Sequence, residues 1–288
     1  MHSHDILHIL EHSVTDTLVA LPFLFLAYLL MEAAEHYHSA KMEKAISGIG
    51  KAGPLVGAAL GCIPQCGFSA SASNLYAAGL LSRGTLIAVF LSTSDEAIPL
   101  LLGASDGRDR ILPLLLAKVI IGILAGYAID FYMSHWGRPR DLHDLCEECG
   151  CEEEGSGILK PALWHTTHIL LYIFLLNLGL GLAVHLLGEE LLAAILLKDS
   201  FLQPFVAALV GLIPNCAVSV LLTQLYLAGT VSFGALLAGL CSGAGLGVAV
   251  LVKMNRSRRE NGQIILTLYL IAALCGLRCS CCFKECRA

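Results

Sequence analysis

Two carboxylates stand together inside an apolar stretch, in the segment LSTSDEAIP at residues 91–99. If this stretch crosses a membrane, Asp95 and Glu96 cost free energy to bury, and such acids usually mark an ion or proton pathway. Lys118, inside the next apolar stretch, is a candidate ion-pair partner and coupling residue. We predict that the two acids bind a cation or a coupling proton. A purely structural pair between Lys118 and one acid is the alternative.

Two proline-containing motifs interrupt other apolar stretches in the same way, GCIPQC at residues 61–66 and GLIPNC at residues 211–216. Proline removes a backbone donor and clashes with the preceding turn, so Pro64 and Pro214 are predicted to act as hinges that end a helix. The N–H groups of a helix that starts after each proline favour electron-rich groups. We predict that thiols and amides near the two hinges bind the substrate or ion: Cys66, Asn74, Asn215 and Cys216.

Close helix packing is the alternative explanation for small and hydroxyl residues in a membrane protein, because they let two backbones approach. For the serines near the two motifs, packing and binding remain equally open. The matching positions of the two Pro-x-Cys motifs are hard to explain by packing alone. We therefore assign the motifs, rather than the serines, to the candidate site.

A possible relay lies on the first apolar run, where His12 and Asp16 are separated by four residues. Residues at this spacing share one face of a helix. We predict that the pair passes protons or ions toward the central site. Other histidines near the ends of the apolar runs are expected to be polar residues that face the membrane interface.

An acidic segment between the two halves, CEECGCEEE, contains Cys146, Cys149 and Cys151 at C-x-x-C-x-C spacing. Three thiolates can ligate one soft or borderline metal ion, with a carboxylate or His143 as a fourth ligand. An accessory metal site in a cytoplasmic linker is one prediction. A solvated acidic linker with incidental thiols is equally open.

Composition sets the class of protein, because 56% of the residues are hydrophobic and only 14% are charged. Soluble domains carry about a quarter charged residues. We expect an all-α integral membrane protein with the lipid bilayer and a small inorganic ion or metalloid as partners. Nucleic acid is not an expected partner, and assembly into a homo-oligomer stays open. No nucleotide-binding motif is visible, so we expect a gradient-driven transporter without cofactor, not an enzyme.

The chain aligns with itself at an offset of 150 residues, so that Gly61, Pro64 and Cys66 match Gly211, Pro214 and Cys216. Two repeats of this kind are typical of transporters. We predict a first transmembrane repeat at 1–134, a cytoplasmic linker at 135–160, and a second repeat with a cysteine-rich end at 161–288. Broken re-entrant hairpins are expected at 53–81 and 203–229, and full spans near 13–34, 84–104, 111–133, 164–187, 231–252 and 264–280.

The orientation follows from the lysines and arginines, which cytoplasmic loops carry in excess. With the N- and C-termini outside, the loops at 35–51, 82–83, 134–163 and 253–262 hold most of them and are cytoplasmic. Each repeat then has three full spans, an odd number, so the second copy is inverted relative to the first. Inverted repeats with broken helices bring two matching tips together near the midplane of the membrane.

The stretch GCIPQCGFSASASNLYAAGLLSRGTLIAVFLSTSDEAIPLLL, with HSVTDTLVALPFLFLAYLLMEAAEH and GLIPNC, resembles the ten-transmembrane heavy-metal exporters. These are relatives of the ArsP arsenic-efflux permeases and are often labelled manganese transporters. Six spans and four half-helices agree with ten segments. The resemblance implies export of a metal or metalloid. Carboxylates favour a Mn²⁺-like cation, whereas Cys66 and Cys216 favour a thiophilic arsenical.

Two other functions fit the same pattern. A thiol–disulfide electron conduit uses inverted repeats and one reactive cysteine next to proline in each half, here Cys66 and Cys216, but it leaves the membrane acids without a role. An ion channel or an uptake carrier is the other alternative, because repeat symmetry does not fix the direction of transport.

Overall fold

The computed structural model describes residues 10–29 except 12, 16, 23 and 27, and residues 52–63, 66–93, 97–104, 108–136, 159–187 and 200–285. Within these residues all regular secondary structure is helical and no strand occurs, as predicted. An unlabelled first helix lies within residues 10–29, and a second covers Ala52–Gly61. The labelled helices are α3 (Cys66–Ala77), α4 (Arg83–Ser92), α5 (Ala97–Gly103), α6 (Arg108–Trp136), α7 (Leu159–Leu187), α9 (Gln203–Gly211), α10 (Cys216–Leu227), α11 (Phe233–Ser242), α12 (Leu246–Met254) and α13 (Arg258–Glu285).

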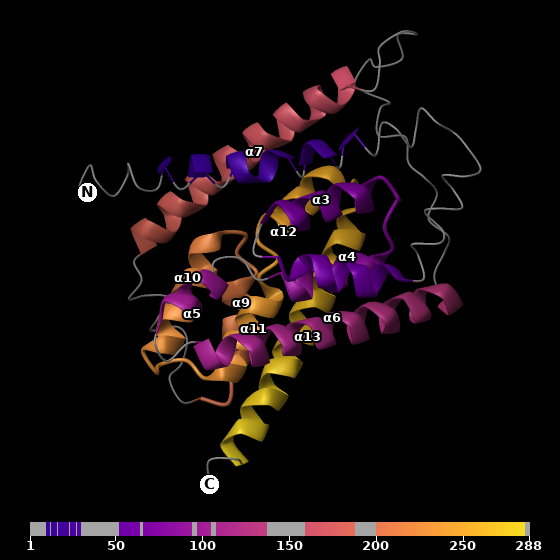
Figure 1. Ribbon diagram of the computed structural model, residues 1–288. Helices are drawn as coiled ribbons and strands as arrows, with labels where there is room; N and C mark the ends of the chain where they lie inside the picture. The colour runs from indigo at the N-terminus through magenta and orange to yellow at the C-terminus, as the bar shows by residue number, and fades with distance from the viewer. Residues whose placement is uncertain are drawn as a thin grey trace.

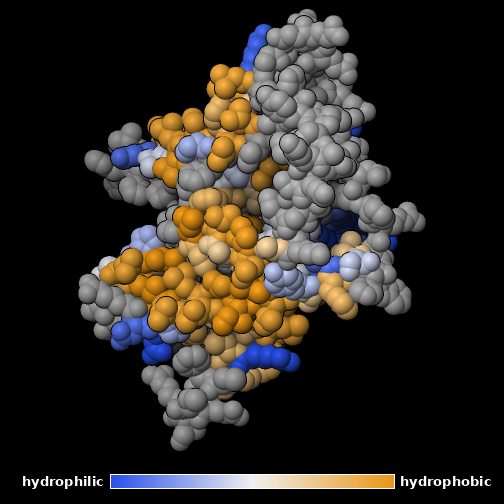
Figure 2. Space-filling model, turned by 45° about the vertical axis from the view of Figure 1, so that its right-hand side comes forward, coloured by the Kyte–Doolittle hydropathy of each residue, from blue (hydrophilic) through white to orange (hydrophobic). Residues whose placement is uncertain are grey.

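Five stretches of the described chain are long and apolar enough to cross a membrane: Arg83–Gly103, Asp109–Ser134, Ala162–Gly179, Phe233–Met254 and Arg258–Cys281. Three shorter apolar helices accompany them, at Ser13–Leu26, Ala52–Gly61 and Cys216–Leu227. Figure 2 shows apolar side chains over much of one face, with the hydrophilic residues toward its margins. These features identify a multi-pass membrane protein.

The sequence repeat is also a repeat of structure, because the ends of matching helices are built alike. Ser82 and Ser232 cap α4 and α11 with nearly identical backbone angles. Each serine side chain accepts a hydrogen bond from the backbone N–H three residues later in the chain. The turn that follows each of α3 and α10 contains a glycine with positive φ, Gly79 at 79° and Gly229 at 75°. In both, the next residue donates to the carbonyl five positions back, a helix-ending motif that glycine favours.

The spans predicted near 84–104 and 231–252 correspond to the apolar stretches Arg83–Gly103 and Phe233–Met254, but the structure adds a break inside each of them. In the first repeat α4 ends at Ser92, and α5 begins at Ala97. In the second, α11 ends at Ser242, and α12 begins after Gly245. Gly245 has φ 52° and ψ −136°, a backbone conformation that only glycine adopts readily. Non-helical backbone at this depth needs a protein-lined environment.

Paired glycines bring two helices of each repeat into backbone contact. A Cβ atom added at Gly84 would lie 2.1 Å from the carbonyl oxygen of Gly126, on α6. At the matching place a Cβ atom on Gly234 would lie 2.3 Å from the carbonyl oxygen of Gly276, on α13. The crossings of α4 with α6 and of α11 with α13 therefore have no room for any side chain at these points.

The first helix and α7 form an outer layer across one side of the molecule, over α3 and α12 (Figure 1). Tyr28 stacks on His165 with ring centroids 5.6 Å apart, and Leu24 and Ile169 join the same apolar cluster. Beneath this layer α3 packs on α12, where Ser73 Oγ lies 2.7 Å from the carbonyl oxygen of Gly247. The helix after the first hairpin motif thus packs on the second repeat.

The long helix α13 contacts the N-terminal ends of both α4 and α11, at different places along its length. Near its own N-terminus, Gln263 accepts a hydrogen bond of 3.2 Å from Arg83, the first residue of α4. Thirteen or more residues later, Gly276 and Ser280 pack against Gly234 in the first turn of α11. At about 1.5 Å per residue these contacts are about 20 Å or more apart.

Candidate functional site

The glycines of the two Pro-containing motifs lie against the ends of the broken spans. A Cβ atom on Gly61 would lie 2.1 Å from Ser92 Oγ, and one on Gly211 would lie 2.1 Å from the carbonyl oxygen of Gly239 and 2.4 Å from Ser242 Oγ. Only glycine allows such an approach. In each repeat the turn of the Pro-containing motif therefore lies where the helix of the neighbouring span ends. The turn and the break together form one structural unit.

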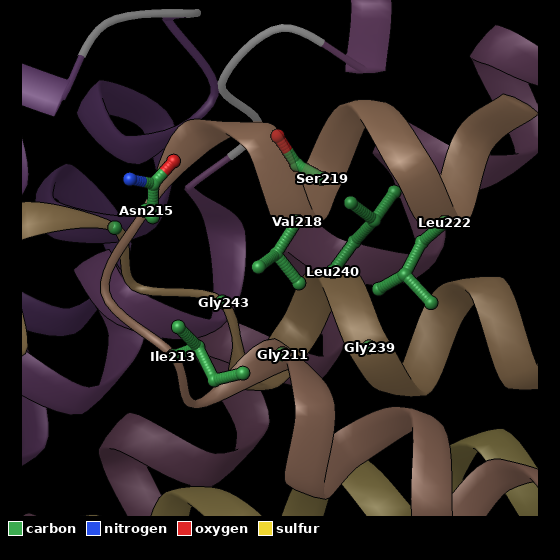
Figure 3. A pocket seen from close by; sticks show the side chains of 10 residues that line it. Gly211, Ile213, Asn215, Val218, Ser219, Leu222, Gly239, Leu240 and Gly243 are labelled. Carbon is green, nitrogen blue, oxygen red and sulfur yellow. The ribbon is translucent and has the colours of Figure 1, made fainter. Parts of the chain in front are cut away.

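In the second repeat this unit borders a small recess with a free volume of about 10 Å³, room for about one water molecule (Figure 3). It opens between the turn before α10 and the break after α11. Its lining is mostly apolar, with Asn215 and Ser219 as the polar side chains: Gly211, Ile213, Asn215, Val218, Ser219, Leu222, Gly239, Leu240, Gly243 and Gly245. The recess thus has the form of a small site with few polar groups.

Asn215 and Cys216 lie at the start of α10, as predicted from the motif. Asn215 caps this helix, since its Oδ1 accepts a 2.8 Å hydrogen bond from the backbone N–H of Ala217. The Cys216 side chain is buried, and its carbonyl oxygen accepts a 2.7 Å hydrogen bond from Ser219 Oγ. Pro214 stands in the turn between α9 and α10.

Lys118 joins the two repeats at their breaks. Its side chain is fully buried, with 0% exposure, although it carries an ammonium group. Nζ donates to the carbonyl oxygen of Thr93, the C-cap residue of α4, and to that of Leu240 near the end of α11, at 2.7 Å for the latter. We predicted an acid as its partner; the structure adds two main-chain carbonyls, and both are at helix carboxyl ends, where the helix dipole favours a cation.

Two thiols that the sequence reasoning did not select lie within electrostatic range of Lys118. They are Cys62, in the first hairpin motif, and Cys241, in the last turn of α11. Cys241 follows Leu240, and only the structure shows that the carbonyl of Leu240 binds Lys118. One thiol from each repeat is therefore in the electrostatic neighbourhood of the central ammonium.

Asn74 lies on α3, which has a buried polar face. Its side chain is fully buried, and Oδ1 accepts a 3.3 Å hydrogen bond from the Tyr28 hydroxyl of the first helix. Among the residues that the structure describes, its Nδ2 atom has no hydrogen-bond partner, and neither does the buried Ser71 Oγ one turn earlier. Buried donors without partners are rare in folded proteins. The structure therefore places Asn74 under the outer layer with an unused donor.

Several predicted residues lie outside the described part of the chain. These are Pro64, His12, Asp16, Asp95, Glu96, Cys146, Cys149 and Cys151. Cys66 is the first residue of α3, but its side chain is not among the described ones. Asp95 and Glu96 fall between Thr93 and the start of α5 in sequence, next to a carbonyl that binds Lys118. Their roles stay predictions.

The model of one protein family matches almost the whole chain, over residues 5–184 and 181–279. Its description is "Putative, 10TM heavy-metal exporter". The chain belongs to this family. The resemblance predicted from the hairpin motifs is confirmed, and membership indicates a multi-spanning heavy-metal exporter instead of an enzyme. No curated protein and no solved structure gives a match to the chain.

Proposed function

We propose that this family member is a gradient-driven exporter whose substrate passes the breaks of the two repeats. The observation that carries the proposal is Lys118, a fully buried ammonium that binds a carbonyl from each break. A charge in the membrane interior usually belongs to a transport pathway. Asp95 and Glu96 follow Thr93 closely in sequence and would hold the cation or coupling proton beside it.

The proposal includes an inverted arrangement of the two repeats. Its support is the pair of contacts along α13: the start of α4 lies near Gln263, and the start of α11 lies near Gly276. The ends of α4 and α11 nonetheless meet at Lys118. Two helices that start at opposite ends of α13 and meet in the middle run in opposite directions, which is what inverted copies require.

The orientation in the membrane is also proposed: both termini outside, and residues 135–160 in the cytoplasm. The hydrogen bond between Arg83 and Gln263 supports it, because it puts the loops at 82–83 and 253–262 near the same end of the molecule. Both loops are basic and were assigned to the cytoplasm by the positive-inside rule. The hairpin at 53–81 would then enter from the cytoplasm and that at 203–229 from outside.

We further propose that the substrate is a thiophilic metal or metalloid. The charge of Lys118 acts on Cys62 and Cys241, and Cys216 is buried at the start of α10. Thiol ligands select soft ions. The ammonium of Lys118 repels a bare divalent cation unless Asp95 and Glu96 offset its charge. A soft metalloid that is uncharged in water has no such conflict.

The purified protein in lipid vesicles tests these proposals with a substrate panel of Mn²⁺, Zn²⁺, Cd²⁺, arsenite and methylated arsenite, each with and without a pH gradient. We expect transport of Cd²⁺ or the arsenicals, stimulated by the gradient, and none of Mn²⁺. Transport of Mn²⁺ alone would contradict the thiophilic assignment. Passive flux of every ion, unaffected by a gradient, would favour a channel, and no flux at all would remove the exporter proposal.

The linker cysteines supply a second test of metal handling. If the linker captures a metal ion in the cytoplasm, replacing Cys146, Cys149 and Cys151 with Ser should raise the substrate concentration needed for half-maximal transport several-fold. The maximal rate should stay unchanged, because the linker is outside the proposed pathway. Matched replacement of Cys281, an exposed cysteine near the other end of the chain, is the control. Equal transport curves for both variants would leave the linker as a plain connector.

A further inference from the structure

The carbonyl oxygen of Leu240 is released from helix hydrogen bonding by the break in α11. In a continuous helix the N–H of Ala244 would bind it. Instead the N–H of Ala244 donates to Ser242, and that of Gly243 donates to Gly239. The ammonium of Lys118 takes the place of the missing donor, at 2.7 Å. The break in α11 therefore creates an acceptor that needs a cation or a donor.

The first repeat supplies the second acceptor. Thr93 caps the carboxyl end of α4, and its carbonyl oxygen also binds Lys118. The carboxyl ends of the two helices both carry partial negative charge. Unwound carbonyls at the carboxyl ends of half-helices are the usual ligands of small monovalent cations in transporters built from repeats. The two breaks thus form the protein side of a cation site.

The matching position of the second repeat shows that the fold does not demand a lysine. Position 268 is the counterpart of 118 at the 150-residue offset, and it is a fully buried leucine in α13. An apolar side chain therefore satisfies the packing of the long helix at this level. Burying an ammonium costs free energy that only suitable acceptors offset. Packing alone therefore does not explain the lysine, whereas the two carbonyls give its ammonium suitable acceptors.

We propose that the carbonyls of Thr93 and Leu240 form a site for a small monovalent cation, and that the protein fills it permanently with its own tethered ammonium. An exporter built this way needs no sodium or potassium ion at the junction of its repeats. Removing the side chain of Lys118 should reopen the site to a free cation. The inference concerns binding alone and does not depend on transport.

The experiment measures the thermal midpoint of the purified full-length protein against increasing chloride salts of potassium, sodium, ammonium and methylammonium. Choline chloride provides the same ionic strength with a cation too large for the site. The wild type should respond equally to all salts. Lys118→Ala should unfold at a lower temperature and should recover saturably with at least one small cation but not with choline.

Two matched variants separate binding from cavity filling. Lys118→Met fills the space with an apolar side chain and should not respond to small cations. Leu268→Ala makes a cavity at the matching position of α13 and should be destabilised without cation-specific recovery. A Lys118→Ala protein that responds to small cations no more than Leu268→Ala does would overturn the proposal.

If Lys118→Ala aggregates on extraction, the same salts are compared by the fraction that elutes as a monodisperse species from size-exclusion chromatography. We expect that fraction to rise with small cations and to stay low with choline. Equal recovery in every salt would overturn the proposal as well.

Discussion

Replacing Asp95 with Asn, or Glu96 with Gln, should reduce transport in vesicles to the level of vesicles without protein, in at least one of the two variants. Both changes keep the size of the side chain and remove only its charge. The two acids follow Thr93, whose carbonyl binds the ammonium of Lys118, and they precede α5. In the proposed site these carboxylates are the anionic partners of the cation or coupling proton, so their loss should stop transport.

Asp109 provides the control for this experiment. It is an exposed acid in the first turn of α6, away from both breaks, so Asp109→Asn should transport at the normal rate. Size-exclusion profiles of all three variants check that each remains folded. Normal export with normal pH dependence in both Asp95→Asn and Glu96→Gln would show that the acids are structural. The thiols and helix ends would then have to bind the substrate alone.

Gly211→Ala should be a strongly damaging substitution in the second repeat. The added Cβ atom would lie 2.1 Å from the carbonyl oxygen of Gly239. This oxygen belongs to the backbone, so it cannot move away by a change of side-chain rotamer. Overpacking of this kind costs about 1–3 kcal/mol, and occasionally more. The turn before α10 would be pushed away from the break in α11. We expect a large drop in the thermal midpoint and a loss of transport.

Gly179→Ala, in α7, is the matched control, because a Cβ atom there would meet nothing within 4 Å. Alanine favours a helix interior over glycine by about 1 kcal/mol. This variant should therefore be at least as stable as the wild type. Equal thermal midpoints for Gly211→Ala and the wild type would contradict the close approach of the hairpin turn to the break.

The features that the sequence predicted are those encoded locally and repeated. Pro64 and Pro214 predicted two interruptions, and in the second repeat the helix indeed stops at Gly211 and restarts at Cys216. The offset of 150 residues predicted matching elements, which the identical serine caps confirm. A proline or a serine cap acts within one turn of its own position. Such signals can be recognised in the sequence without knowledge of the tertiary structure.

The breaks in the second spans were missed because they carry no strong local signal. Three hydroxyl residues and two acids precede Ala97, but the length and hydropathy of the whole stretch still indicate a continuous span. Around Gly243 and Gly245 the glycines fit close helix packing equally well. The partners of Lys118 were missed for a similar reason. Every residue has a main-chain carbonyl, so the sequence does not show which carbonyls bind the lysine. Only the tertiary structure brings the ends of α4 and α11 to one ammonium.

The glycine crossings have a mechanical consequence. Where Gly84 meets Gly126 and Gly234 meets Gly276, the helix backbones touch, so neither pair can slide or tilt without a collision of main-chain atoms. Each of these helix pairs is therefore expected to move as one rigid body. A large movement would then be absorbed where α4 and α11 end, at Thr93 and at Gly243–Gly245. The two breaks are thus the expected hinges of the protein.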